Sequence, residues 1–141
     1  MPIVDLPLYQ RNIIITRSKE GILDIKKIFI SKGANVFDLP AISIADPDDL
    51  NPLDEALNQI NDFHWIIFSS SNGIKFVDKR LRYFNSSLKE CSKKTKIAVV
   101  GEKTSKTLDD FGIKADFIPP EFVAESLIDN FPVSGYGLRV F

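Results

Sequence analysis

Three short polar segments carry the residue types that could do chemistry in this chain of 141 residues. They span residues 16–18, 69–73 and 101–104, and each directly follows an apolar run. Hydroxyl, amide and glycine residues dominate all of them. Exposed backbone N–H groups at such corners, together with the positive end of a helix dipole, suit a carboxylate or a phosphate. These corners are therefore the candidate binding sites.

Each corner also has a purely structural interpretation. Serine and threonine are common residues at helix starts, so a single one after a strand more often caps a helix than binds a ligand. Gly101 by itself is typical of a turn. No segment matches the glycine-rich loops that hold nucleotide phosphates or dinucleotides. The sequence therefore predicts no nucleotide cofactor.

The single histidine and the single cysteine do not form a convincing reactive pair. His64 lies just before Trp65, at the amino end of a predicted strand, so we interpret it as a structural or surface residue. Cys91 lies in a polar stretch with no base nearby, so we do not expect it to act as a nucleophile. The aspartates at positions 46, 48 and 49 lack the spacing of a calcium loop. We predict no metal site and no disulfide.

Composition narrows the class of protein. The chain is 44% hydrophobic and 26% charged, with 18 basic against 19 acidic residues. Because there is no basic excess, we expect no nucleic-acid partner and no binding to an anionic membrane. No apolar run approaches the roughly 20 residues of a membrane span, and the first ten residues do not resemble a secretory signal. We expect a cytoplasmic location.

The corners are positioned by an alternation of strand-like and helix-like segments. Residues 12–16 form a continuous β-branched run, residues 18–33 have helical spacing, and residues 35–39 are again strand-like. This order predicts a right-handed βαβ unit. Residues 41–44 could be extended. The remaining predicted elements are helices at 53–60, 73–84, 103–111 and 123–131, and strands at 65–68, 96–100, 115–118 and 135–141.

This pattern indicates an α/β fold with a mostly parallel sheet and flanking helices. In such folds, ligands bind beyond the carboxyl ends of the strands, which is where the polar corners fall. The chain ends partway through its last predicted strand, and such a strand normally has a covering helix after it. We therefore expect the chain to be truncated.

Several segments, taken in order, resemble the uroporphyrinogen-III synthase family. Residues 63–74 (FHWIIFSSSNGI) resemble its aromatic strand ending in Thr/Ser-Ser-x-Asn-Gly/Ala-Val. Residues 97–104 (IAVVGEKT) resemble its Val-Gly-x-x-Thr corner, and residues 108–117 show the spacing that follows it. Residues 122–127 resemble a helix entry after a proline, and Thr16-Arg17 resembles the first corner.

The resemblance implies a flavodoxin-like, two-domain architecture that is present only in part. Residues 1–41 would be the N-terminal βαβ portion of domain 1, whose remainder would come from the missing half. Residues 42–48 would be a connector, and residues 49–141 would be domain 2, incomplete at its C-terminus. A tyrosine proposed as the proton donor lies in the missing half, and Tyr136 is not its equivalent. We expect the fragment alone to be inactive.

The same resemblance implies an activity that needs no cofactor. The family converts hydroxymethylbilane to uroporphyrinogen III, with loss of water, inversion of the last pyrrole ring and closure of the macrocycle. Thr104 would assist the leaving group, and Arg17 would meet a substrate carboxylate or pair with a nearby acid. The remaining substrate-binding residues would be Ser69, Ser70, Ser71, Asn72, Gly73 and Gly101. The complete enzyme is expected to be a monomer.

Two alternatives remain open at this point. The chain could be a synthase-like module that binds a tetrapyrrole or a protein without catalysis. It could also be a flavodoxin-like regulatory domain, although it lacks the acidic pocket and phosphoacceptor context that such a domain needs.

Overall fold

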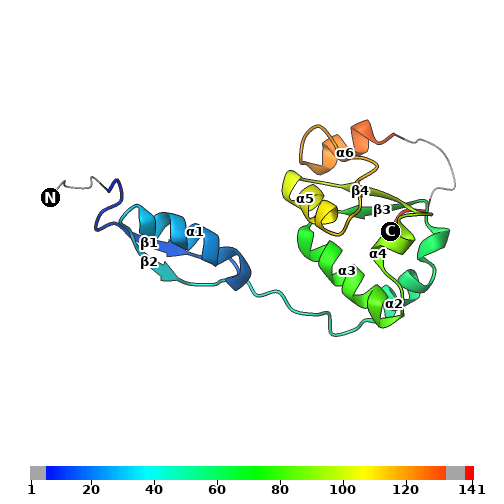
Figure 1. The fold of residues 1–141 in the computed structure, drawn as a ribbon, viewed down its shortest axis with the longest axis horizontal. Helices are drawn as coiled ribbons and strands as arrows, with labels where there is room; N and C mark the ends of the chain where they lie inside the picture. Colours follow the sequence, from blue (N-terminus) through cyan, green and yellow to red (C-terminus); the bar gives the residue numbers. More distant parts are fainter. Residues whose placement is uncertain (1–5, 133–138) are drawn as a thin grey trace. The chain divides into compact units, whose positions relative to one another are not determined.

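The computed structural model describes residues 6–132 and 139–141. The chain divides into two compact units, Met1–Asp48 (unit 1) and Asp49–Phe141 (unit 2), which are described separately. Figure 1 labels the elements of each unit. Within the described residues, no helix has the length and apolar character needed to cross a membrane.

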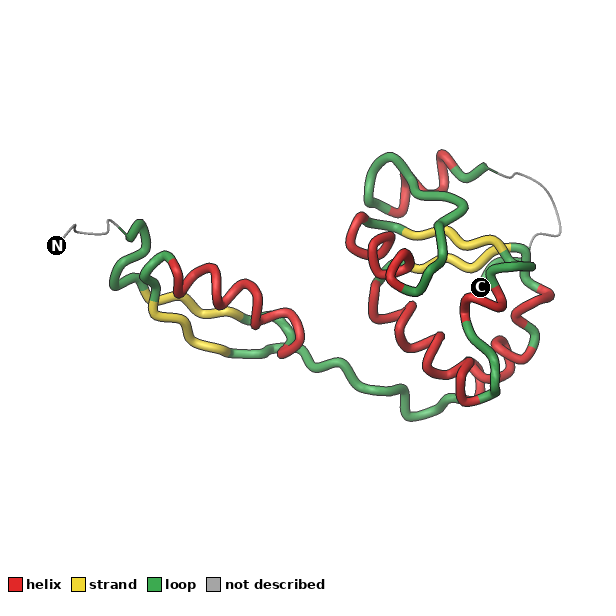
Figure 2. The backbone as a smooth tube through the Cα atoms, viewed as in Figure 1, coloured by secondary structure: helices red, strands yellow, loops and turns green. Residues whose placement is uncertain are grey.

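Unit 1 is a single βαβ element, as predicted. Strand β1 (Asn12–Ile15) and strand β2 (Asn35–Asp38) pair in parallel, with Asn12 opposite Asn35. Parallel neighbours cannot be joined by a tight turn, so helix α1 (Lys19–Ser31) makes the crossover between them (Figure 2). A single helix covers part of this small sheet, and the described residues of the unit include few buried apolar side chains: Ile15, Ile22 and Ala34.

Gly33 ends α1 for two physical reasons. Its φ of +92° is a conformation that glycine adopts without strain, and its N–H donates to the carbonyl of Ile30 at 2.9 Å. A Cβ at this position would also lie 2.8 Å from the Cβ of Leu6, too close for any substituted residue. The predicted helix end is therefore confirmed.

Unit 2 is built on a parallel sheet with β3 (Trp65–Phe68) and β4 (Lys96–Val99) at its centre. Val140 bridges Trp65 on one side, and Phe117 bridges Ala98 on the other, both in parallel. The predicted strand at 115–118 is thus reduced to a bridge. Of the predicted strand at 135–141, residues 135–138 lie outside the described part of the chain.

Six short helices surround the described part of this sheet (Figure 1). They are α2 (Asn51–Asn58), the 3₁₀ turn η1 (Ile60–Asp62), α3 (Ser71–Tyr83), α4 (Leu88–Cys91), α5 (Glu102–Asp110) and α6 (Ala124–Asn130). Helix α3 begins two residues earlier than predicted, and α4 was not predicted. Residues 41–44, which could have been extended, form no strand.

The core of unit 2 lies on both faces of β3 and β4. Ile66, Ile97 and Val99 have no exposed surface, and they pack with Ile74 of α3 and Leu108 of α5. Continuous apolar strands are what a parallel sheet covered on both faces requires. This explains why both strands were predictable almost to the residue.

Asp78 is a buried carboxylate that joins two helices. Its side chain is 6% exposed and accepts hydrogen bonds from Nε of Arg82 at 2.6 Å and from the N–H of Leu88 at 2.9 Å. Leu88 is the first residue of α4, so the carboxylate attaches the start of α4 to the middle of α3. A buried carboxylate is tolerated because both contacts are hydrogen bonds.

Asp54 and Arg80 form a two-pronged ion pair between α2 and α3. Nε of Arg80 donates to Oδ1 of Asp54 at 2.6 Å, and Nη2 donates to Oδ2 at 2.6 Å. The hydrogen bonds from the guanidinium, and secondarily its charge, lower the pKa of Asp54 below the ordinary value. The pair thereby fixes α2 against the side of α3.

Replacing Asp78 by alanine is expected to lower the free energy of unfolding by about 1–3 kcal/mol, because the buried N–H of Leu88 loses its acceptor. Urea unfolding followed by circular dichroism measures this. Arg82→Ala is the matched control, because it removes only one of the two contacts of Asp78 and its side chain is 65% exposed, so its loss should cost less than the loss of Asp78. Equal losses in the two variants would contradict the assigned role of Asp78.

The Asp54–Arg80 pair predicts a pH dependence of stability. Because folding lowers the pKa of Asp54, the pair stabilises the protein above the unfolded carboxyl pKa, about 3.9. That contribution is lost as pH falls through the lowered folded pKa. Urea midpoints of the wild type and Asp54→Asn should therefore differ at pH 7 and converge in acid. Glu55→Gln removes an exposed carboxylate of the same helix and controls for net charge.

Candidate functional site

The carboxyl edge of the sheet in unit 2 brings two of the predicted corners together. β3 leads into residues 69–73 and β4 leads into residues 100–104, and the two strands are direct neighbours. Since both strands run in the same direction, their polar corners lie side by side at one edge. The helices that begin there, α3 and α5, also pack against each other.

The first corner is mostly the opening turn of α3. Ser70 is the N-cap, and its Oγ accepts the N–H of Gly73 at 3.2 Å. That hydroxyl and that amide therefore already have partners within the protein. Ser69 and Asn72 are exposed, and their side chains make no hydrogen bond to any described residue. Among the predicted binding residues 69–73, these two therefore have side chains that are free to contact a ligand.

Ser71 links the two helix starts. Its Oγ lies 3.3 Å from the carbonyl oxygen of Lys103, to which it donates, and 2.9 Å from Oγ1 of Thr107. Thr107 also lies 3.0 Å from the same carbonyl oxygen. These three atoms form one small network, in which each hydroxyl has a single proton to donate. The predicted binding residue Ser71 thus has a structural partner in α5.

Gly101 gives the second corner its shape. Its φ is +102° and its ψ is 145°, a conformation that side chains rarely adopt. As the N-cap of α5 it offers no side chain, so no side-chain hydrogen bond caps this helix. The first intrahelical bond runs from Ser105 to the carbonyl of Gly101 at 3.0 Å. The N–H groups of the first helical turn are therefore available to an anion.

Thr104 lies in that first turn, with its hydroxyl close to Gly101. The residue is 5% exposed, and a Cβ on Gly101 would lie 3.7 Å from Oγ1 of Thr104. This hydroxyl has no hydrogen-bond partner among the described residues, and no fully buried polar side-chain atom in the described chain lacks a partner. The oxygen of Thr104 therefore keeps a small accessible surface, although the residue as a whole is buried.

A third corner at the same edge was not identified as a site from the sequence. Residues 116–118 run parallel to β4 and lead into Pro119 and Pro120. An open groove of about 450 Å³ lies between this corner and the outer face of α5. The groove is lined by Glu102, Ser105, Lys106, Asp109, Ile118 and Phe122. Two carboxylates against one lysine make this groove a poor place for an anion.

The first corner of unit 1 holds Arg17. Its side chain forms no ion pair with a described side chain, whereas Lys26 pairs with Asp38 at 2.8 Å on the same unit. The side chain lies instead against Gly21 in the first turn of α1. Ser18 is the N-cap residue of that helix but makes no side-chain capping bond. The guanidinium of Arg17 and a helix start without a side-chain cap therefore occur together at the carboxyl edge of β1. Within that helix start, the N–H of Gly21 donates to the carbonyl of Ser18 at 2.9 Å.

His64 lies at the opposite, amino edge of the sheet in unit 2. Its ring Nδ1 accepts the backbone N–H of Arg139 at 3.0 Å, and the backbone N–H of His64 donates to the carbonyl of Arg139 at 2.9 Å. These bonds attach residues 139–141 alongside β3. The histidine has the structural role predicted for it, away from the polar corners.

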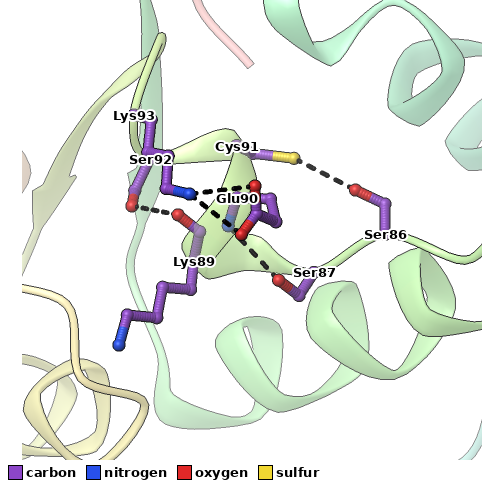
Figure 3. A network of polar contacts seen from close by, with 7 residues as sticks. All are labelled: Ser86, Ser87, Lys89, Glu90, Cys91, Ser92 and Lys93. Carbon is purple, nitrogen blue, oxygen red and sulfur yellow. Dashed lines mark hydrogen bonds and ion pairs between the residues drawn. The ribbon is translucent and has the colours of Figure 1, made fainter.

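Cys91 is unsuited to nucleophilic chemistry (Figure 3). It is 3% exposed, and its Sγ points to Oγ of Ser86 at 3.9 Å. Burial raises the pKa of the thiol, which disfavours the reactive thiolate. The surrounding polar contacts organise α4, since Oγ of Ser87 accepts the N–H of Glu90 at 3.2 Å. No group of three potential metal ligands occurs in the described residues.

Known proteins resemble this chain in sequence and in fold. The family model for uroporphyrinogen-III synthase HemD matches residues 24–139. The uroporphyrinogen-III synthase of Synechococcus elongatus is 39% identical over 136 residues, covering 95% of this chain and 50% of the relative. A porphyrin biosynthesis protein HemD from Ruminiclostridium josui is 32% identical over 119 residues, covering 82% of this chain and 23% of that protein.

A solved structure agrees at the level of fold. The crystal structure of uroporphyrinogen III synthase from Thermus thermophilus matches with a TM-score of 0.54 at 10% identity, covering 87% of this chain and 48% of that one. The predicted α/β fold class is thus confirmed. The chain spans half the length, or less, of these relatives. The segments 63–74 and 97–104 both lie inside the residues that the family model matches. The chain belongs to the uroporphyrinogen-III synthase family.

Proposed function

We propose that this chain supplies part of a uroporphyrinogen-III synthase that converts hydroxymethylbilane to uroporphyrinogen III. One observation carries the proposal: two helices with different N-termini, α3 and α5, begin side by side at one edge of the sheet. The start of α5 offers uncapped amides and the hydroxyl of Thr104, and the start of α3 offers Ser69 and Asn72. Family membership supports the same activity.

The proposed substrate suits these groups. Hydroxymethylbilane carries acetate and propionate side chains on four pyrroles, and loss of its terminal hydroxyl leaves a reactive azafulvene. A reaction of this kind depends on positioning and on stabilising the leaving group more than on a strong nucleophile. Amides at a helix start bind carboxylates with charge-assisted hydrogen bonds, each contributing roughly 1.5–3 kcal/mol. The corner residues would thus hold the side chains while the ring closes.

Thr104 is the residue to which we assign a direct part in the chemistry. Its hydroxyl would donate a hydrogen bond to the departing hydroxyl group, which lowers the free energy of the developing charge. The low exposure of the residue, 5%, favours a fixed direction for that donor. Gly101, Ser69 and Asn72 would bind carboxylates beside it. Ser70, Ser71 and Gly73 would act mainly by shaping the start of α3.

Arg17 would hold a further carboxylate from unit 1. It carries a positive charge without an acidic partner among the described side chains, next to the uncapped start of α1. A carboxylate placed there would meet both the guanidinium and the helix dipole.

Further chain would complete both the fold and the site. Unit 1 leaves Ile14 63% and Phe37 55% exposed, and these two residues are direct partners across β1 and β2. An apolar sheet face of this kind is normally covered by another layer. We propose that residues 1–41 form the start of a domain whose remainder, including the proton donor, lies in the other half of the protein. The complete protein would act as a cytoplasmic monomer.

A non-catalytic binding module is not favoured. The relatives that resemble the chain are named as synthases or as porphyrin biosynthesis proteins. Both Thr104 and the glycine that shapes its corner are present.

Activity of the longest gene product that contains this chain tests the proposal. Hydroxymethylbilane is supplied, and the products are oxidised and separated by chromatography. The expected product is uroporphyrinogen III, in which the last ring is inverted, formed faster than in a sample without protein. Residues 1–141 alone are expected to give no more of this product than the sample without protein. Closure without ring inversion as the sole outcome for the longer product would reject the proposal.

Thr104→Val is expected to lower kcat by about tenfold to a hundredfold, because a donor that acts on the leaving group contributes roughly 1.5–3 kcal/mol. The change keeps the shape of the side chain and removes the hydroxyl. Thr95→Val is the matched control, since Thr95 is also a buried threonine (0% exposed, against 5% for Thr104) but lies at the amino edge, where it donates to the carbonyl of Ile60 at 3.1 Å. The control should lose stability and keep its turnover. Unchanged turnover in Thr104→Val would remove Thr104 from the mechanism.

A further inference from the structure

A polar network joins the N-terminal parts of α3 and α5. Oγ1 of Thr107 lies 2.9 Å from Oγ of Ser71 and 3.0 Å from the carbonyl oxygen of Lys103. Oγ of Ser71 lies 3.3 Å from that same carbonyl oxygen. Ser71 is the first residue of α3, whereas Lys103 and Thr107 belong to α5. The network therefore links two helices across 32 to 36 positions of the sequence.

Thr107 has a local partner that would satisfy its hydroxyl without any help from α3. The carbonyl of Lys103 is four residues before it, and threonines inside helices commonly donate to a carbonyl at that spacing. The contact with Ser71 is additional. Two hydroxyl oxygens 2.9 Å apart repel each other unless a proton lies between them, so one of the two donates to the other. Because Thr107 is only 9% exposed, water has little access to replace this bond.

Apolar packing alone would position the two helices less precisely. Ile74 of α3 and Leu108 of α5 have no exposed surface and belong to one core cluster. Apolar contacts are non-directional, so they tolerate small shifts of one helix along the other. A hydrogen bond weakens steeply when its geometry departs from the ideal. The contact between Ser71 and Thr107 is therefore suited to fix where the two helices begin relative to each other.

The network lies next to the groups that the proposed function uses. Lys103 directly precedes Thr104, and Ser71 directly precedes Asn72. A shift of α5 along α3 would move the hydroxyl of Thr104 relative to the side chain of Asn72. In the proposed function, the first acts on the leaving group and the second binds a substrate carboxylate. A misplacement of about 1 Å can lower the rate of a reaction roughly a hundredfold.

We propose that Thr107 is a positioning residue for Thr104. Its hydroxyl, bonded to Ser71, holds the start of α5 at a fixed place beside the start of α3. Thr107 itself touches no substrate. This inference rests on the function proposed above, because the position of Thr104 matters only if Thr104 acts on the substrate.

The substitution Thr107→Val separates this role from a purely structural one, because valine keeps the shape of the side chain and removes the hydroxyl. The experiment uses the longest gene product that contains this chain, with hydroxymethylbilane as substrate. We expect kcat to fall about threefold to tenfold and KM to stay within about twofold of the wild type, because the substrate still binds while Thr104 is misplaced. Thr107→Ser keeps the hydroxyl and should restore kcat.

Two further variants test whether Thr107 acts through its neighbours. Ser71→Ala removes the partner on α3 and leaves Thr107 its bond to Lys103, so it should keep the fold and lower kcat to a similar degree. This variant decides the question if Thr107→Val fails to fold. In a Thr104→Val background, Thr107→Val should have little further effect on kcat, because the hydroxyl that it positions is absent.

Thr95→Val is again the matched control. Its side chain is buried at the amino edge and donates to the carbonyl of Ile60, so the change should lower the melting temperature and leave kcat unchanged. A kcat that falls in Thr104→Val but not in Thr107→Val or Ser71→Ala would overturn the positioning role alone. Fully additive losses in the Thr104→Val/Thr107→Val double variant, or no recovery of kcat in Thr107→Ser, would also overturn it. Failure of the wild-type protein to form uroporphyrinogen III would reject the proposed function, and this inference with it.

Discussion

The parallel pairing of β3 and β4 is the constraint on which unit 2 depends. Both strands are buried on both faces, with Ile66, Ile97 and Val99 fully excluded from solvent. Parallel neighbours require crossover segments, so α3 follows β3 and α5 follows β4 on the way to the next strand position. The same geometry places the polar corners after both strands at one edge. The position of the candidate site is thus a consequence of how the core is formed.

The N-termini of α3 and α5 at that edge differ chemically because their N-cap residues differ. Ser70 satisfies an amide of α3 with its own hydroxyl, whereas Gly101 leaves the start of α5 without a side-chain cap. An anion therefore finds more unpartnered donors at α5 than at α3. The net charge of the chain is −1, so the chain has no broad positive field that would attract an anion. Any attraction for an anion at this edge comes from local donors.

Gly101 shapes the second corner of unit 2. Its φ of +102° demands glycine, because a side chain there would strain the backbone. As the N-cap of α5, this residue also brings no side chain that could accept a hydrogen bond from the amides of the first turn. One residue therefore sets both the turn of the backbone and the lack of a side-chain cap at this corner.

The sequence by itself determined the α/β class, the family and the strands Trp65–Phe68 and Asn12–Ile15, because continuous apolar β-branched or aromatic runs carry that information locally. It also placed the polar corners at strand ends. Only the tertiary structure decided which corner side chains are already occupied. Ser71 is engaged by Thr107 and by the carbonyl of Lys103, more than 30 positions away in the chain. Such partners are set by how helices pack, and no local pattern of residue types encodes that.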